Sequence, residues 1–509
     1  MSADLILNNA SVITMDPDRP AAGVVAVKGN KILAVGGSEV LGEVRGAKTR
    51  VIDCQGKTVV PGFNDAHCHI FSFIRSLRSL DLSPSSVSSI AEIKALVRRR
   101  AWSLPAGSWL SGSGYNEFYL AEKRHPNRRD LDEAAPHHPV ILTHRSLHAC
   151  VLNSLALALA GITRETPEPA GALIERESET GEPSGLLFEM LGYIREKVVP
   201  PLSDDELAEG MAAANEHYLS MGVTSLQEAS VTNNFTRWQT LKRFTEDGSL
   251  KSRVFMMFGV DALSQFQEAG LNFGAGDSHL RLGGVKLMLG ETTNLPGLKR
   301  QAFSAHKAGF QLALHCVETG TVAAAIAALE DISNELPLPG RRHRLEHCSE
   351  CPPPLLERLI RLKAMVVTQP PFLYYSGERY LATIPPARRK WLYRLKSFLD
   401  GGLVVAGSSD SPVAPDNPLV GIYAAVTRRA QSGEELSPEE TVSAEQALAM
   451  YTINAACASF EEEIKGAITP GKLADMVVLS ADPLRSPLEQ IKDIRVEMTI
   501  INGRVVWEA

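Results

Sequence analysis

Several residues of this chain have the types and spacing of metal ligands. His67 and His69 are separated by one residue, and three further candidates each follow a short apolar segment: His315, His347 and Asp410. Imidazole and carboxylate groups are ordinary ligands of zinc and other divalent ions. Because side chains alternate in direction along a strand, His67 and His69 would point one way and Cys68 the other. The pattern predicts a site for a divalent metal, and zinc, manganese, iron and cobalt all accept such ligands.

Cysteine directly follows three of these histidines, which raises the alternative of a Cys/His zinc site. The chain has 7 cysteines, scattered and odd in number, so a disulfide framework is not expected. Strand alternation assigns Cys68, Cys316 and Cys348 to the layer beneath the surrounding helices. The Cys348-x-x-Cys351 motif lacks the second pair that a zinc site needs.

Lys286 lies inside the otherwise apolar segment 283–289. A lone charge in an apolar interior costs several kcal/mol or lowers the pKa of the lysine. Two interpretations remain open. Either the lysine lies at the surface on an edge strand, or its neutral amine reacts with carbon dioxide to form a carbamate, an anionic group that can bridge two cations.

Short apolar strands alternate with helical stretches from about residue 63 to residue 464, which predicts parallel β/α units and an α/β fold. Eight such strands favour a (β/α)8 TIM barrel, and the metal candidates would lie at the carboxyl ends of their strands, where barrel active sites lie. The predicted strands are 59–67, 139–143, 222–227, 283–289, 310–315, 343–347, 364–369 and 403–408.

The chain is longer than a barrel of roughly 250 residues requires. Most of the excess lies between the first and third predicted strands, which predicts an insertion at about 71–138. Residues 1–62 and 465–509 contain short strands with hairpin signals at Gly29-Asn30 and Asn502-Gly503. Neither end has enough strands for a stable sheet. Both ends are therefore predicted to form one small composite β-sandwich domain beside the barrel domain, 63–464.

Composition excludes several classes of function. Hydrophobic residues make up 44% and charged residues 22%, as in ordinary globular proteins. The net charge of −7 provides no basic surface for nucleic acid. The chain has no apolar run of about 18 residues and no readable signal peptide, so we expect a cytoplasmic protein with no membrane partner. A homo-oligomer is compatible with the sequence.

Taken in chain order, these residues resemble the amidohydrolase superfamily. The resemblance rests on Pro61-Gly-Phe-Asn-Asp-Ala-His-Cys-His69, Lys286, His315, His347, Asp410 and the closing segment 466–479. Within the superfamily the chain is most similar to amidohydrolase family 3, the group of YtcJ-like proteins and N-substituted formamide deformylases. The stretches that carry this similarity are 145–157, 344–347, 368–372, 409–413 and 424–428.

The resemblance implies a metal-dependent hydrolase that cleaves a C–N bond in an amide, N-acyl, N-formyl or carbamoyl substrate through attack of a metal-bound hydroxide. Asp410 would accept the proton of the attacking water and return it to the leaving nitrogen. The implied cofactor is a divalent metal, zinc in the first place, with one or two ions per chain. The implied ligands are His67 with His69 on one ion, His315 with His347 on the second, a carbamate on Lys286 between them, and Asp410 beside the water.

The resemblance also implies residues on the substrate side. His148 would contact the substrate carbonyl or the oxyanion that forms from it. Arg145 and Asn153 would orient the substrate, or alternatively cap helices. Aromatic residues in a loop at 372–380 would line an apolar pocket, or alternatively pack in the core. Gly290–Thr293 differs from the lysine and Asp-Gly pair usual in family 3.

Two other functions stay open. His315 and Glu318 form an H-x-x-E motif like that of single-metal hydrolytic deaminases, in which the glutamate binds substrate and moves protons. The other interpretation is that Glu318 begins the next helix, where a carboxylate is favoured, and Lys286 has no role in the deaminase scheme. The second alternative is a non-catalytic assembly protein on the same fold, although such relatives lack the metal ligands.

Overall fold

The computed structural model describes residues 1–509 except 170, 291–292 and 339. The chain divides into two compact units, Met1–His69 with Asn215–Ala509, and Ile70–Ala214. The first contains the barrel and a β-domain, and the second is the insertion.

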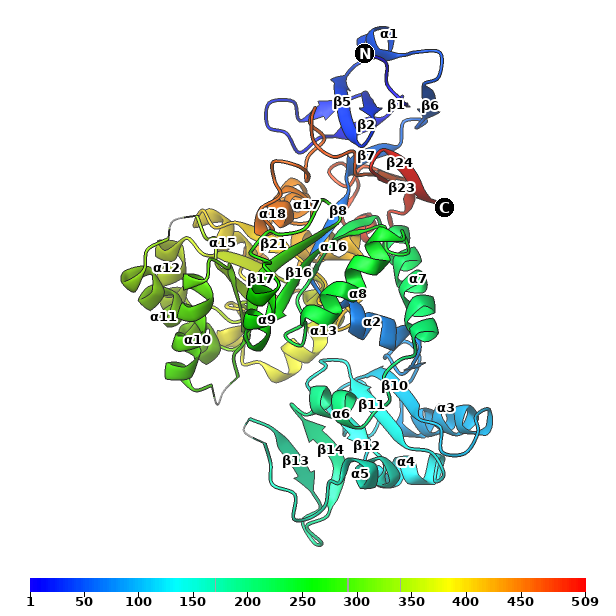
Figure 1. The fold of residues 1–509 in the computed structure, drawn as a ribbon, viewed down its shortest axis with the longest axis vertical. Helices are drawn as coiled ribbons and strands as arrows, with labels where there is room; N and C mark the ends of the chain where they lie inside the picture. Colours follow the sequence, from blue (N-terminus) through cyan, green and yellow to red (C-terminus); the bar gives the residue numbers. More distant parts are fainter. Residues whose placement is uncertain (170, 291–292, 339) are drawn as a thin grey trace. The chain divides into compact units, whose positions relative to one another are not determined.

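Eight parallel strands form the barrel sheet of the first unit (Figure 1). The sheet is joined at its ends after the last strand, where the amide of Asp410 donates a hydrogen bond of 2.8 Å to the carbonyl of His67. In sheet order the strands are β21 (Val405–Gly407), β20 (Met365–Thr368), β19 (Arg344–His347), β18 (Leu312–Cys316), β17 (Leu280–Met288), β16 (Arg253–Gly259), β15 (Val223–Glu228) and β8 (Phe63–Cys68).

The barrel prediction is confirmed, but one of its strands was wrongly assigned. Segment 139–143 forms β11 (Val140–His144), which pairs with strands of the second unit. The third barrel strand is instead β16, whose run of Phe and Met is equally compatible with a buried helix. The two errors offset each other along the chain, so Lys286 still lies on the fourth strand and His315 on the fifth.

The Ile70–Ala214 unit is larger than the predicted insertion, 71–138, because β11 and the strands after it belong to it. One face of its sheet packs on α3 (Ile90–Trp102) and α4 (Arg128–Ala134), and the other packs on α5 (Ser154–Ala160) and α6 (Leu191–Lys197). The sheet order is β13 (Leu173–Arg176), β14 (Pro183–Phe188), β12 (Ala149–Leu152), β11, β10 (Leu110–Tyr115) and β9 (Leu80–Asp81).

Both chain termini form one β-domain, as the hairpin signals predicted. Strand β22 (Met476–Leu479) pairs antiparallel with β7 (Thr58–Pro61), which joins the end of the chain to its beginning. Residues from both sheets fill one shared core. The sheets are β5 (Lys31–Gly36), β4 (Val24–Lys28), β1 (Leu5–Asn8) and β6 (Arg50–Asp53), and β24 (Arg504–Glu508), β23 (Val496–Ile501), β22, β7, β2 (Ser11–Ile13) and β3 (Ala21–Ala22).

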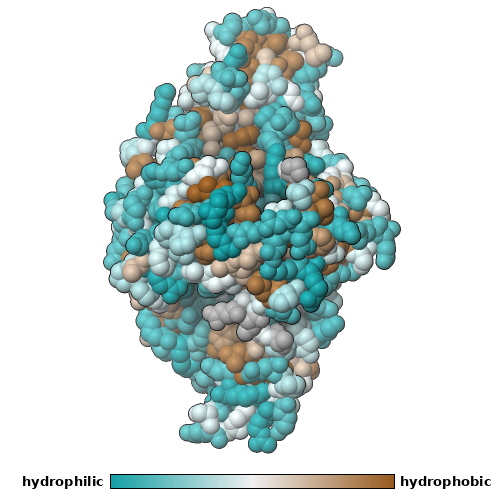
Figure 2. Space-filling model, turned by 90° about the vertical axis from the view of Figure 1, so that its left-hand side faces the viewer, coloured by the Kyte–Doolittle hydropathy of each residue, from teal (hydrophilic) through white to brown (hydrophobic). Residues whose placement is uncertain are grey.

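Among the described residues, no helix combines the length and apolar composition that crossing a bilayer requires. On the face of the molecule seen in Figure 2, hydrophilic side chains separate small apolar areas.

Candidate metal centre

Three of the predicted ligands meet at the carboxyl end of the barrel strands. The possible ligand atoms of His67, His69 and Asp410 all lie within 4.8 Å of one another. Oδ1 of Asp410 is 3.0 Å from Nε2 of His69 and 3.5 Å from Nε2 of His67. His67 lies near the end of β8, His69 follows that strand and Asp410 follows β21, so the junction that joins the sheet also assembles the cluster.

Asp410 fits a metal ligand because its Oδ1 is buried without a hydrogen-bond donor in the described part of the chain. Nδ1 of His67 donates to Glu346, and Nδ1 of His69 lies 2.9 Å from the hydroxyl of Ser230. When each Nδ1 donates, both Nε2 lone pairs face the carboxylate. Three acceptor atoms directed at one point are mutually repulsive, and a cation there would satisfy all of them.

The protonation state of Asp410 is also that of a metal ligand. Burial alone would favour the neutral acid, but the contact with His69 and the imidazoles of His347 and His67 hold the pKa of Asp410 below its ordinary value. The carboxylate is therefore ionised at neutral pH, as a metal ligand or a proton acceptor must be.

Lys286 is 1% exposed, and its strand β17 pairs with β16 and β18. The alternative of a surface lysine on an edge strand was therefore wrong. Its Nζ lies 3.2 Å from Nε2 of His67. Burial lowers the pKa of Lys286 to about 8, so about a tenth of the side chain is neutral amine at pH 7, far more than for an ordinary lysine.

The second histidine pair lies beside the first. The ring centroids of His315 and His347 are 4.5 Å apart, and that of His347 is 4.8 Å from that of His67. Nδ1 of His347 lies 2.8 Å from Oε1 of Gln369, so the ring donates there and its Nε2 carries the lone pair. Burial lowers the pKa of His347 to about 4, which keeps it in the neutral, metal-binding form. All six predicted ligands thus lie at one end of the barrel.

The structure adds a residue that the sequence analysis left without a role. Glu346 is fully buried and accepts the proton of Nδ1 of His67. Arg344 donates to both oxygens of Glu346, to Oε1 of Gln227 at 2.5 Å and to the carbonyl of Ala66 at 2.6 Å. Glu346 therefore fixes the tautomer that presents the Nε2 lone pair of His67. The sequence feature that could have indicated this role is the Arg344-x-Glu346 pattern, which places two charged side chains on the same side of a buried strand.

We expect Glu346→Gln to weaken metal binding by about 10- to 100-fold, the usual effect of removing a carboxylate that orients a histidine ligand. Competition with a chelating dye would measure the affinity. Glu350→Gln is the matched control, since that buried carboxylate pairs with Arg388 at 2.5 and 2.6 Å. Equal metal affinity in Glu346→Gln and the wild type would contradict this role.

The cysteines do not join the cluster. Cys68, Cys316 and Cys348 are all fully buried. Sγ of Cys68 lies 3.7 Å from the carbonyl of Gln227, and Sγ of Cys316 lies 3.6 Å from that of Glu346. Burial raises the pKa of the Cys68 thiol, so the thiolate form that binds zinc is disfavoured. The assignment of these cysteines as buried, non-ligating residues agrees with the geometry.

Three predicted substrate-side residues belong to the Ile70–Ala214 unit. His148 follows β11, and its Nδ1 lies 2.8 Å from Oε1 of Glu189. Arg145 is partly buried, and its amide donates to the carbonyl of Tyr115 at 3.0 Å. The contacts of these two residues with substrate stay predictions.

Asn153 has the helix-capping role that the sequence analysis gave as the alternative to substrate binding. Its Oδ1 accepts from the amides of Ala156 and Val140, both at 3.0 Å. Its Nδ2 donates to the carbonyls of His138 at 2.8 Å and Ala135 at 3.4 Å. The side chain is fully buried and its hydrogen-bonding groups are all engaged, so none is left for a substrate.

We expect Asn153→Ala to lower the free energy of unfolding by about 2–3 kcal/mol, because it removes a helix cap and leaves buried backbone groups unpaired. Urea unfolding measures this change. Asn234→Ala, which removes only the cap of α8 (Phe235–Glu246), should cost about 1 kcal/mol. Equal losses in the two variants would contradict the larger role of Asn153.

Glu318 is exposed at the start of α11 (Thr319–Glu335), as expected for the helix-start interpretation. Residues 372–380 form part of helix α13 (Pro371–Thr383) rather than a loop. Tyr380 is buried with its hydroxyl 2.7 Å from that of Tyr393, while Phe372 and Tyr374 pack against the same cluster. These aromatics therefore follow the packed-core alternative. Of the segment Gly290–Thr293, residues 291–292 lie outside the described residues.

Comparison with known proteins agrees with this geometry. The chain is 29% identical to an N-substituted formamide deformylase of Arthrobacter pascens, over 99% of this chain and 98% of the relative. It is 28% identical to the putative amidohydrolase YtcJ of Bacillus subtilis, over 99% of both chains. The crystal structure of an uncharacterized metal-dependent hydrolase from Pyrococcus furiosus superposes with a TM-score of 0.72 at 26% identity, over 94% of this chain and 100% of that one.

The sequence profile that describes the amidohydrolase family matches residues 50–507, which include the barrel, the insertion and about half of the β-domain. The matched region contains every predicted metal ligand, from His67 to Asp410. The chain therefore belongs to the amidohydrolase family and is related to metal-dependent hydrolases.

Proposed function

We propose that this protein is a divalent-metal-dependent hydrolase of the C–N bond in amide, N-acyl, N-formyl or carbamoyl compounds. The observation that carries the proposal is the buried Oδ1 of Asp410, which has no hydrogen-bond donor among the described residues and faces the Nε2 atoms of His67 and His69. The name of the Arthrobacter pascens relative, an N-substituted formamide deformylase, supports N-formyl substrates as the first class to test.

The residues divide between holding the metal and moving the proton. His67 and His69 would hold one ion and His315 and His347 a second, with a carbamate on Lys286 between them. A divalent ion at this position would lower the pKa of its bound water toward about 7 and polarise the substrate carbonyl. Zinc is our first choice because neutral imidazole and carboxylate ligands suit it.

Asp410 would move the proton. Its ionised carboxylate takes a proton from the attacking water and returns it to the leaving nitrogen, which without that proton is a poor leaving group. Lys286 is suited to carbamate formation because burial lowers the pKa of its amine to about 8, and carbon dioxide reacts with the neutral amine.

A single-metal deaminase is the weaker alternative. It depends on Glu318, which is exposed at the beginning of a helix, whereas the buried Lys286 lies next to His67 and would have no role in such an enzyme. The burial of Lys286 within the cluster therefore favours the carbamate arrangement.

A hydrolysis screen tests the proposal. The protein would be reconstituted with zinc, manganese, iron or cobalt in the presence of bicarbonate and offered amides, N-formyl amines, N-acyl amino acids, carbamates and cyclic ureas. We expect metal-dependent release of amine from at least one of these classes. Aminopurines and other ring amines would be included for comparison, and turnover restricted to them, with release of ammonia, would support the deaminase instead.

A further inference from the structure

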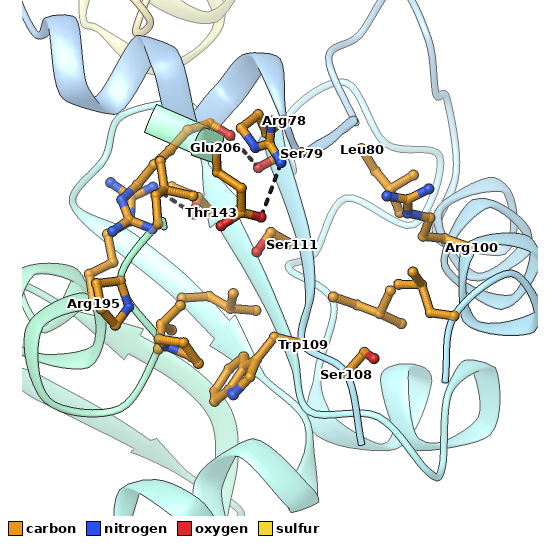
Figure 3. A pocket seen from close by; sticks show the side chains of 18 of the residues that line it. Arg78, Ser79, Leu80, Arg100, Ser108, Trp109, Ser111, Thr143, Arg195 and Glu206 are labelled. Carbon is orange, nitrogen blue, oxygen red and sulfur yellow. Dashed lines mark hydrogen bonds and ion pairs between the residues drawn. The ribbon is translucent and has the colours of Figure 1, made fainter. Parts of the chain in front are cut away.

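The Ile70–Ala214 unit contains a cavity of about 730 Å³ that none of the metal-site residues lines. Its walls come from the end of α2 (Ile70–Leu77), from α3, from the sheet and from α6 with the segment that follows it. Cavities of this size hold small organic ligands. Figure 3 shows Arg78, Arg100 and Arg195 on different sides of it.

Two of the sheet residues that line the cavity, Ser111 and Thr143, have small polar side chains, which leaves space on this side of the sheet. Ser111 is paired with Ile141, and Ser113 with Thr143, so Ser111, Ile141 and Thr143 face the same side. The alternate residues of these strands, Leu110, Val140 and Leu142, belong to the apolar core against α3 and α4. Hydroxyl groups thus occupy positions where large apolar side chains would otherwise fill the space.

The lining is strongly basic, although the whole chain has a net charge of −7. Among the described lining residues a single one is acidic, Glu206, against four arginines: Arg75, Arg78, Arg100 and Arg195. A local positive field in an acidic protein attracts anions. The planar guanidinium group suits carboxylate and phosphate oxygens because it can donate two parallel hydrogen bonds.

The arginines differ in whether a carboxylate neutralises their charge. Arg78 pairs with Glu206 and Glu209, each at 3.0 Å, in a partly exposed position. Arg195 donates to the hydroxyl of Thr143 at 3.3 Å, which directs its guanidinium toward the sheet. On α3, Lys94 and Arg98 pair with Glu133, whereas Arg100 forms no ion pair within the described ranges. The positive charge of Arg100 is thus uncompensated by a nearby carboxylate.

The remaining lining is apolar and includes Trp109, Leu104 and Val199. Figure 3 shows the indole of Trp109 at the cavity, near Ser108. An occupant would therefore combine an anionic group with an apolar body. We propose that this cavity is a binding site for a small organic oxyanion, a carboxylate or phosphate carried on an aromatic or aliphatic group. The site lies outside the metal centre and goes beyond the proposed hydrolysis.

Isothermal titration of the full-length protein tests this site with four probes: benzoate, phenyl phosphate, inorganic phosphate and neutral benzamide. We expect benzoate or phenyl phosphate to bind one to one. Benzamide and inorganic phosphate should bind at least ten-fold more weakly, because benzamide lacks the anionic group and inorganic phosphate lacks the apolar group. Comparison of benzoate with phenyl phosphate identifies the preferred oxyanion.

Matched variants locate the binding. Arg100→Gln and Arg195→Gln should each raise the Kd at least ten-fold, whereas Arg99→Gln, an exposed neighbour outside the lining, should change it less than about two-fold. If Arg195→Gln does not fold, the Kd values of Arg100→Gln and Arg99→Gln still show whether the ligand binds in this cavity. Lack of saturation by both aromatic anions at about 10 mM, equal binding of benzamide, or an equal effect of Arg99→Gln would overturn the proposal.

Discussion

Replacing Asp410 with asparagine is expected to lower kcat by a factor on the order of 10² to 10⁴, the usual span for a general acid–base group. Asparagine keeps the size of the side chain but cannot accept the proton of the attacking water. The histidines and Lys286 remain, so the metal content should stay unchanged. Turnover of a substrate from the hydrolysis screen and elemental analysis of the same sample would measure both quantities.

Asp416→Asn is the matched control for that variant. Asp416 is also buried and lies six residues further along, where Nε2 of His217 is 2.6 Å from its Oδ1. Removal of this charge should affect stability rather than the chemical step. Near-normal turnover in Asp410→Asn would remove Asp410 from the mechanism, and loss of metal from it would make the residue chiefly a ligand.

Replacing Lys286 should have the second large effect. Lys286→Met removes the amine that would form the bridging carbamate, so we expect metal content in the presence of bicarbonate to fall from about two ions per chain toward one. The loss of several kcal/mol of electrostatic stabilisation corresponds to a fall in kcat on the order of 10² to 10⁴. Elemental analysis and turnover would be measured with and without bicarbonate.

A smaller substitution supplies the control. Lys286→Ala leaves space next to His67, so short carboxylic acids such as acetate or propionate should restore part of its activity by taking the place of the carbamate. Methionine fills that space, and Lys286→Met should not respond. Full activity of Lys286→Met with one ion per chain would favour the single-metal deaminase.

The clustering of the candidate metal ligands was predictable because the sequence signals for it are local. Strand alternation explains why His67 and His69 meet, and placement at carboxyl strand ends explains why His315, His347 and Asp410 join them. The hairpin signals at both ends likewise predicted the composite β-domain. In each case a short sequence pattern determines the direction of side chains along a strand or the position of a turn. The parallel strands of the barrel then bring the candidate ligands to one end.

Pairing partners and supporting contacts were harder to predict. Segments 139–143 and 253–259 are both short and apolar, and only tertiary packing decides which of them enters the barrel. Glu346 contacts His67 from a position 279 residues away, so no local pattern shows that contact. Asn153 stands in a motif shared with substrate-side candidates, yet its hydrogen bonds show a capping role.

The most direct test of the metal centre is a crystal structure of the zinc-reconstituted protein, with anomalous data collected at the zinc edge. We expect a peak at about 2.0–2.2 Å from Nε2 of His67 and of His69, a second beside His315 and His347, and density for a carbamate on Lys286. Zinc bound elsewhere, or these imidazoles pointing apart around an unmodified lysine, would contradict the account.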